Sequence, residues 1–107
     1  MSNSRYSPDA PSRDEVDALE GPAVLDFGTE WCGHCRRVQP LVTEALAQHP
    51  EVRHIKVEDG SGRRLGRSYR VTLWPTLIFL KDGREVARLV RPGDGGKISE
   101  ALAGIAG

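Results

Sequence analysis

The chain has 107 residues, in which 15 lysines and arginines are balanced by 15 aspartates and glutamates, so its formal net charge is zero. This length suits one domain, and the balanced charge excludes a field that would attract nucleic acid or an anionic membrane surface. A membrane-spanning helix needs about 18 consecutive apolar residues, and the sequence has no such run.

Residues 1–11 are polar and contain Pro8 and Pro11, which predicts a flexible N-terminal extension ahead of one domain over residues 12–107. This stretch lacks the apolar core of a signal peptide. The two cysteines, Cys32 and Cys35, belong to one short motif and leave no structural disulfide. We therefore expect a protein of the reducing cytoplasm.

The first half of the chain predicts two helices and two strands. Ser12 and Glu15 have the spacing of a capping box that begins a short helix. The apolar run 23–27 suits a buried strand, and apolar residues at three- and four-residue steps predict a helix over about 35–48. Residues 52–58 form the second strand, which lies parallel to the first because a helical crossover joins them.

The second half predicts a short basic helix over 63–69 and two strands, 77–80 and 84–90, joined by a tight hairpin turn. A loop over 91–96 precedes a closing amphipathic helix marked by Ile98, Ala101, Leu102 and Ile105. The whole order is typical of an α/β domain in three layers, with a central mixed sheet and helices on both faces.

The motif Cys32-Gly33-His34-Cys35 stands where the strand 23–27 gives way to the first long helix. Two thiols with two residues between them can close a small disulfide ring. The free N–H groups and the positive dipole end of a helix stabilise a thiolate at the first cysteine. In such places a cysteine pKa falls from about 8.5 to between about 3.5 and 7.5. The motif therefore indicates a redox site.

Two alternatives remain open for these cysteines. With His49 and His54 they have the spacing of a zinc site, although Pro50 separates the histidines and ends the helix. The other alternative is a pair of inert buried thiols.

Several motifs together carry a resemblance to a known family: Trp31-Cys32-Gly33-His34-Cys35, Asp26 before it, Pro40 in the helix, Lys56 in the next strand and Trp74-Pro75-Thr76. In this order and spacing they resemble thioredoxin over about residues 16–105. The resemblance implies the thioredoxin-like three-layer fold, with a sheet of four strands. A fifth, first edge strand would fall where the N-terminal prolines lie, so we expect it to be missing or very short.

The resemblance also implies a division of roles. Cys32 attacks a substrate disulfide, and Cys35 then attacks the mixed disulfide and releases the substrate. Asp26, which lies in an apolar strand where burial disfavours its charge, takes the proton of Cys35 with help from Lys56. The alternatives are an Asp26 that reaches solvent at the strand end and a Lys56 whose stem lies along apolar surface.

His34 is a further departure from the thioredoxin pattern, which usually has Gly-Pro between its cysteines; Gly-His occurs in protein disulfide isomerase. An imidazolium here would favour the Cys32 thiolate and make the disulfide a stronger oxidant; the alternative is an exposed spacer. Gly28 stands where thioredoxin commonly has a tryptophan. Trp74 stands where thioredoxin has an aliphatic residue.

The substrate surface implied by the resemblance comprises Trp31, Gly33, Trp74, Pro75 and Thr76. Pro75 is expected to follow a cis peptide bond, beside which a substrate strand can pair with the backbone. For Trp31 the alternative is a core position. Trp74 either lies exposed as a substrate contact or turns inward beside Gly28.

These observations predict a thiol–disulfide oxidoreductase with no cofactor beyond its own dithiol, acting on disulfide-containing proteins as a monomer. We expect it to be a reductase, more oxidising than a thioredoxin with Gly-Pro, that receives electrons from a donor such as a thioredoxin reductase or glutathione. The alternative is a protein-binding module that uses the Trp31, Trp74 and Pro75 surface without redox turnover.

Overall fold

The computed structural model describes residues 5–106, in which four helices and four strands follow one another in the predicted order. Their bounds are α1 Arg13–Asp17, β1 Pro22–Gly28, α2 Gly33–Ala47, β2 Arg53–Glu58, α3 Arg64–Ser68, β3 Thr76–Lys81, β4 Arg84–Val90 and α4 Gly95–Ile105. Within the described part of the chain, every helix is too short or too polar to cross a bilayer.

The helix starts show local capping chemistry. Ser12 and Glu15 form the predicted capping box at α1. The helix α4 begins inside the stretch 91–96 that we expected to be a loop, because the Asp94 carboxylate accepts a hydrogen bond from the Lys97 N–H at 3.1 Å and thereby caps two glycines into the first turn.

The strands form one mixed sheet in the order β2-β1-β3-β4. As predicted, β1 and β2 are parallel, and β3 runs antiparallel to both β1 and β4. Asp82 and Gly83 turn the β3–β4 hairpin with φ of 50° and 79°, the positive values that a two-residue hairpin turn requires.

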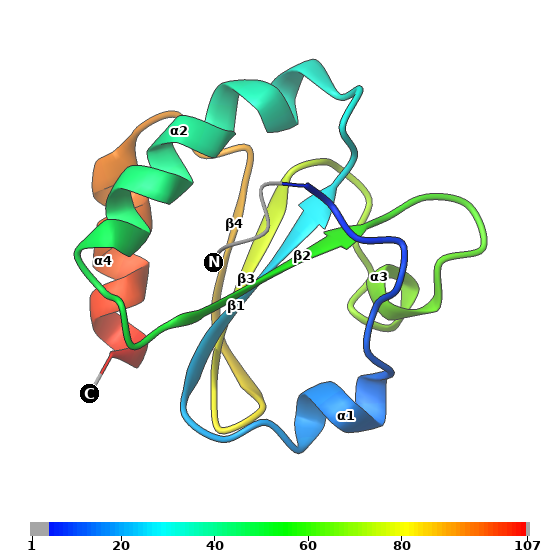
Figure 1. Ribbon diagram of the computed structural model, residues 1–107, viewed down its shortest axis with the longest axis horizontal. Helices are drawn as coiled ribbons and strands as arrows, with labels where there is room; N and C mark the ends of the chain where they lie inside the picture. The colour runs from blue at the N-terminus through cyan, green and yellow to red at the C-terminus, as the bar shows by residue number, and fades with distance from the viewer. Residues whose placement is uncertain (1–4, 107) are drawn as a thin grey trace.

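Helices cover both faces of this sheet, with α2 and α4 on one side and α1 and α3 on the other (Figure 1). Because side chains alternate along a strand, Val24 packs under α2 and α4, whereas Leu25 and Phe27 pack toward α1 and α3. Asp26 and Gly28 share the face of Val24. The alternation therefore aims Asp26 at the layer that begins with the two cysteines.

The N-terminal segment differs from the prediction of a flexible extension over residues 1–11. Tyr6 is only 5% exposed, and Ser7 pairs with Val57 in an isolated parallel bridge. The Ser7 N–H donates to the Lys56 carbonyl at 3.1 Å, and the Glu58 N–H donates to the Ser7 carbonyl at 2.9 Å. The expected short edge strand is thus reduced to one bridge; residues 1–4 of that prediction lie outside the described residues.

Tyr6 is held because Gly28 makes room for it. A Cβ placed on Gly28 would lie 2.8 Å from Tyr6 Cζ and 2.5 Å from Cys35 Sγ. The ring thus fills the space in front of the glycine. The polar composition of the first eleven residues gave no sign of this packing and therefore predicted a flexible segment.

We predict that Gly28→Ala lowers the free energy of unfolding by about 1–3 kcal/mol, the usual cost of overpacking a filled site. Gly104→Ala is the matched control, because a Cβ at that helical position meets nothing within 4 Å and should stabilise the protein by up to about 1 kcal/mol. Urea unfolding of both reduced variants measures the difference, and equal stabilities would contradict the packing described here.

Candidate active site

The two cysteines occupy the first turn of α2. Cys32 is the N-cap, with φ of −78° and ψ of 119°, and its sulfur accepts a hydrogen bond from the Cys35 N–H at 3.4 Å. Both cysteines are free thiols, and Cys35 is completely buried. The helix starts at Gly33, two residues earlier than predicted, because Cys32 itself caps it.

The surroundings of Cys32 favour its thiolate. Burial by itself raises the pKa of this thiol, but hydrogen bonds from the Cys35 thiol and from the backbone N–H groups of Cys35 and His34, together with the charge of Arg91, outweigh burial and lower the pKa below its ordinary value. His34 thus contributes through its backbone, and its side chain is exposed. The effect of the imidazole itself stays a prediction.

Cys35 has the opposite character. Burial, followed by the hydrogen bond with Cys32, raises the pKa of the Cys35 thiol to about 12. Cys35 therefore keeps its proton at neutral pH and needs a base before it can act as a nucleophile.

The residue that we expect to accept the proton of Cys35 is Asp26. It is completely buried, so the alternative of a carboxylate that reaches solvent is wrong. Tyr6 Oη donates to Asp26 Oδ1 at 3.2 Å, Gln39 Nε2 donates to Oδ2 at 3.2 Å, and His54 Nε2 lies 2.9 Å from Oδ2. No pattern in the sequence marks these three partners of Asp26, since they come from three separate parts of the chain.

Lys56 joins the same group of polar side chains. It is buried, its Nζ donates to Gln39 Oε1 at 2.8 Å, and it lies 4.4 Å from the centroid of the Tyr6 ring. Burial lowers the pKa of Lys56, while the charges of Asp26, Glu30 and Cys35 oppose that change. Lys56 is paired with Asp26 across β1 and β2, and the charges of the two side chains interact. That Lys56 helps Asp26 take the proton of Cys35 stays a prediction.

The histidines of the alternative zinc arrangement have other contacts. His49 Nδ1 lies 3.6 Å from Glu51 Oε2, and His54 Nε2 is directed at Asp26. Within residues 5–106 there is no group of three or more His, Cys, Asp or Glu side chains suited to a metal ion.

The surface beside the cysteines is built by two tryptophans. Trp31 is 74% exposed, so the core alternative for it is wrong, and its ring meets that of Trp74 edge-on at 5.6 Å between centroids. Trp74 is half-buried, and its Nε1 donates to Asp59 Oδ2 at 2.8 Å. Trp74 matches neither alternative alone, because Tyr6 fills the space in front of Gly28 while half-buried Trp74 packs against the cluster of Tyr6, Cys32 and Cys35.

The turn before β3 has the predicted cis peptide bond between Trp74 and Pro75. Pro75 and Thr76 are buried, and the Thr76 hydroxyl donates to the Leu73 carbonyl at 2.6 Å. The prediction that Thr76 belongs to the substrate surface is wrong for its side chain, which holds the turn together instead. Gly33 is exposed, with open space where a side chain would stand.

Arg91 fastens this turn from the opposite side. Its Nε donates to the Trp74 carbonyl at 2.8 Å, and its backbone N–H donates to the Pro75 carbonyl at 3.0 Å. The sequence analysis placed Arg91 only in a loop. No local pattern marks it, because its neighbours Cys32 and Trp74 are distant in the chain.

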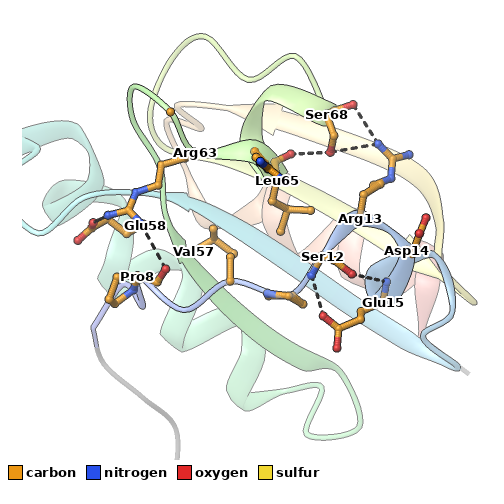
Figure 2. Close-up of a pocket in the computed structure, with 14 residues that line it drawn as sticks. Pro8, Ser12, Arg13, Asp14, Glu15, Val57, Glu58, Arg63, Leu65 and Ser68 are labelled. Carbon is orange, nitrogen blue, oxygen red and sulfur yellow. Dashed lines mark hydrogen bonds and ion pairs between the residues drawn. The ribbon is translucent and has the colours of Figure 1, made fainter.

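A pocket on the α1 and α3 side of the sheet lies away from this chemistry (Figure 2). Arg63 there pairs with Glu58 and donates to the Pro8 carbonyl at 3.4 Å, and Arg13 donates to the Ser68 carbonyl at 2.9 Å. These cations already have partners, and neither cysteine lines the pocket.

Comparisons with known proteins agree on one family. The family model for thioredoxin matches residues 9–103. The thioredoxin of Chlamydia trachomatis is 41% identical over 70 residues, which cover 65% of this chain and 69% of that protein. The reduced form of thioredoxin 2 from Pseudomonas aeruginosa is 59% identical with a TM-score of 0.85, and 94% of each chain is covered. Fasciola hepatica thioredoxin is 32% identical with a TM-score of 0.70, and 86% of each chain is covered.

We predict that Arg91→Gln raises the pKa of the Cys32 thiol and slows its alkylation at neutral pH, because the cation that favours the thiolate is lost. The rates should converge at alkaline pH, where the thiol is ionised in both proteins. They should also converge at about 1 M salt, where the Debye length falls to about 3 Å.

Arg91→Lys is the matched control, since it keeps the charge and changes the shape. It should alkylate nearly as fast as the unmodified protein. A rate in Arg91→Gln that equals that of the unmodified protein at low salt would show that this cation does not act on Cys32.

Proposed function

Because this chain belongs to the thioredoxin family, we propose that it reduces disulfides of protein substrates with a Cys32–Cys35 pair more oxidising than one separated by Gly-Pro. The chain is a thiol–disulfide oxidoreductase with a thioredoxin-like fold. The observation that carries the proposal is the contrast between the two thiols: surroundings that favour a thiolate at Cys32, and a pKa of about 12 at Cys35.

The reaction begins at Cys32. Its thiolate attacks one sulfur of a substrate disulfide, so that a mixed disulfide forms and the other substrate sulfur leaves as a thiolate that takes a proton from solvent. Cys35 then loses its proton toward Asp26 and attacks the Cys32 sulfur. The bond to the substrate breaks, the second substrate thiol is released, and the protein is left with a Cys32–Cys35 disulfide; two electrons have passed to the substrate.

The position of the dithiol–disulfide equilibrium follows from the same contacts. Interactions that stabilise the Cys32 thiolate stabilise the reduced protein, and so raise the reduction potential. One of them is the backbone N–H of His34, a donor that proline at this position lacks. This supports a pair more oxidising than one with a Gly-Pro spacer.

A reducing cytoplasm fits the single pair of cysteines, and there the surrounding thiol pool would hold the pair reduced. In that setting the net task is reduction of disulfide-containing proteins, with electrons supplied by a thioredoxin reductase or by glutathione. We propose that the protein works as a monomer.

A protein-binding module without turnover is the competing function. Reduction of insulin disulfides with dithiothreitol as the electron source separates the two, because a binding module gives no rate above the uncatalysed reaction. The buried Asp26, bonded to Gln39 of the helix that carries Cys35, favours turnover, since a binding surface would have no use for a buried base.

We predict that Cys35→Ser accumulates mixed disulfides with protein substrates and that Cys32→Ser accumulates none. The first variant keeps the attacking thiolate and lacks the thiol that resolves the intermediate. Non-reducing electrophoresis after acid quenching measures the adducts. Adducts that form on Cys32→Ser and not on Cys35→Ser would reverse the assigned roles.

We predict that His34→Pro lowers the reduction potential by about 30 mV, which corresponds to about 1.4 kcal/mol for a two-electron couple and to the low end of a hydrogen bond to a charged group. His34→Gln keeps the backbone N–H and should shift the potential much less. Equilibration with glutathione measures both. If both variants lower the reduction potential equally, the imidazole and not the backbone N–H of His34 raises the potential.

A further inference from the structure

The proton that leaves Cys35 needs a path, and the structure offers one through a residue from the N-terminal segment. The Tyr6 hydroxyl donates to Asp26 Oδ1 at 3.2 Å, and Tyr6 packs in one buried cluster with Cys32 and Cys35. Gly28 makes this meeting possible, because its missing Cβ would lie 2.5 Å from Cys35 Sγ and 2.9 Å from Tyr6 Oη. The hydroxyl thus bonds to the Asp26 carboxylate and lies in the same buried cluster as the Cys35 thiol.

A second residue connects Asp26 to solvent. Asp26 is completely buried, whereas the side chain of His54, whose Nε2 lies 2.9 Å from Asp26 Oδ2, is 15% exposed. An imidazole can accept a proton at one nitrogen while it releases one from the other. His54 therefore lies where a proton on Asp26 can reach the surface.

We propose that Tyr6 and His54 carry the proton of Cys35 to solvent through Asp26 during resolution of the mixed disulfide, an inference that rests on the proposed function. Tyr6 takes the thiol proton of Cys35 as it gives its own proton to Asp26. Asp26 passes a proton to His54 Nε2, and His54 releases one to water. The Cys35 thiolate that remains attacks the Cys32 sulfur, the bond between Cys32 and the substrate sulfur breaks, and the substrate leaves as a thiolate that takes a proton from solvent. The two electrons of the broken bond stay on the departing substrate sulfur.

The groups around the Tyr6 hydroxyl suit a transfer in which both protons move together. Burial, followed by the charges of Asp26 and Cys35, raises the pKa of Tyr6 well above its usual range, so a free tyrosinate is disfavoured. Lys56 lies over the ring and donates to Gln39, which in turn donates to the Tyr6 hydroxyl oxygen at 2.8 Å. On the other side, the Tyr6 N–H donates to the Glu30 carboxylate.

Tyr6 could instead serve only to fill the space in front of Gly28, and Tyr6→Phe separates these roles because it keeps the ring and removes the hydroxyl. The probe is a chromogenic aromatic disulfide, mixed with the fully reduced protein in a single turnover. It releases one coloured thiolate when Cys32 attacks and a second when Cys35 resolves the mixed disulfide. The two steps are thus measured separately in one trace.

In Tyr6→Phe the first release should keep its rate, whereas the second should be about 100-fold slower near pH 7, a typical loss for a missing proton carrier. The second rate should then rise about tenfold per pH unit, because hydroxide ionises Cys35 directly and the thiolate fraction sets the rate. The variant should therefore approach the unmodified protein at alkaline pH.

The matched control is Tyr69→Phe. Tyr69 is also buried, but it lies on the opposite face of the sheet, and its hydroxyl has no hydrogen-bond partner within the described residues. Both releases should be unchanged in this variant.

The transfer of the proton from Asp26 through His54 to solvent is tested with His54→Gln, which retains a donor for Asp26 but cannot exchange protons. Its second release should also be slowed near neutral pH and recover at alkaline pH, and it decides the proposal if Tyr6→Phe does not fold. His49→Gln, which changes a histidine in contact with Glu51, is the control that should leave both releases unchanged.

Three outcomes are decisive. A second release in Tyr6→Phe and His54→Gln that matches the unmodified protein at every pH overturns the relay. A second release slowed by the same factor at every pH assigns these residues a structural role and also overturns it. If the unmodified protein gives no release at all, the proposed function fails, and this result is distinct from both of the others.

Discussion

The burial of Asp26 under the first turn of α2 is the constraint on which the rest of the site depends. A carboxyl group removed from water is costly unless other groups bond to it, and here Tyr6, Gln39 and His54 do so at 2.9 to 3.2 Å. They come from the N-terminal segment, α2 and β2. Satisfying one buried carboxyl group therefore ties three parts of the chain to β1, among them the helix that carries Cys35.

The departures of this chain from the usual thioredoxin pattern are physically linked. Gly28, where a tryptophan is common, leaves a space that Tyr6 fills. The chain has a tryptophan at position 74 instead of at position 28. The indole N–H of Trp74 donates to Asp59 at 2.8 Å. The absence of a side chain at Gly28 thus leaves room for Tyr6 in the interior, while the ring of Trp74 meets that of Trp31.

The two thiols are controlled from opposite sides of the same helix turn. Backbone N–H groups and Arg91 act on Cys32 from the surface, and Arg91 also holds the turn at Trp74 and Pro75. Burial and the hydrogen bond with Cys32 raise the pKa of Cys35 in the interior. A helix N-terminus suits this arrangement, because residues in its first turn point to different surroundings. The same short motif therefore supplies an attacking thiolate, Cys32, and a thiol that stays protonated until it is needed, Cys35.

The sequence alone determined the order and type of the elements, the parallel pairing of β1 and β2, the redox motif, the buried Asp26 and the cis bond before Pro75. Most of these features depend on patterns within a few residues. The expectations for Asp26, for its partner Lys56 and for Pro75 depend on the agreement of several motifs with one family. The sequence did not reveal the position of Tyr6, the contact of His54 with Asp26 or the action of Arg91 on Cys32. Tyr6 and His54 lie 20 and 28 residues from Asp26, and no local rule spans such separations. Only the tertiary structure decided them, because strand register, side-chain alternation and the gap at Gly28 together determine which distant polar groups meet in the interior.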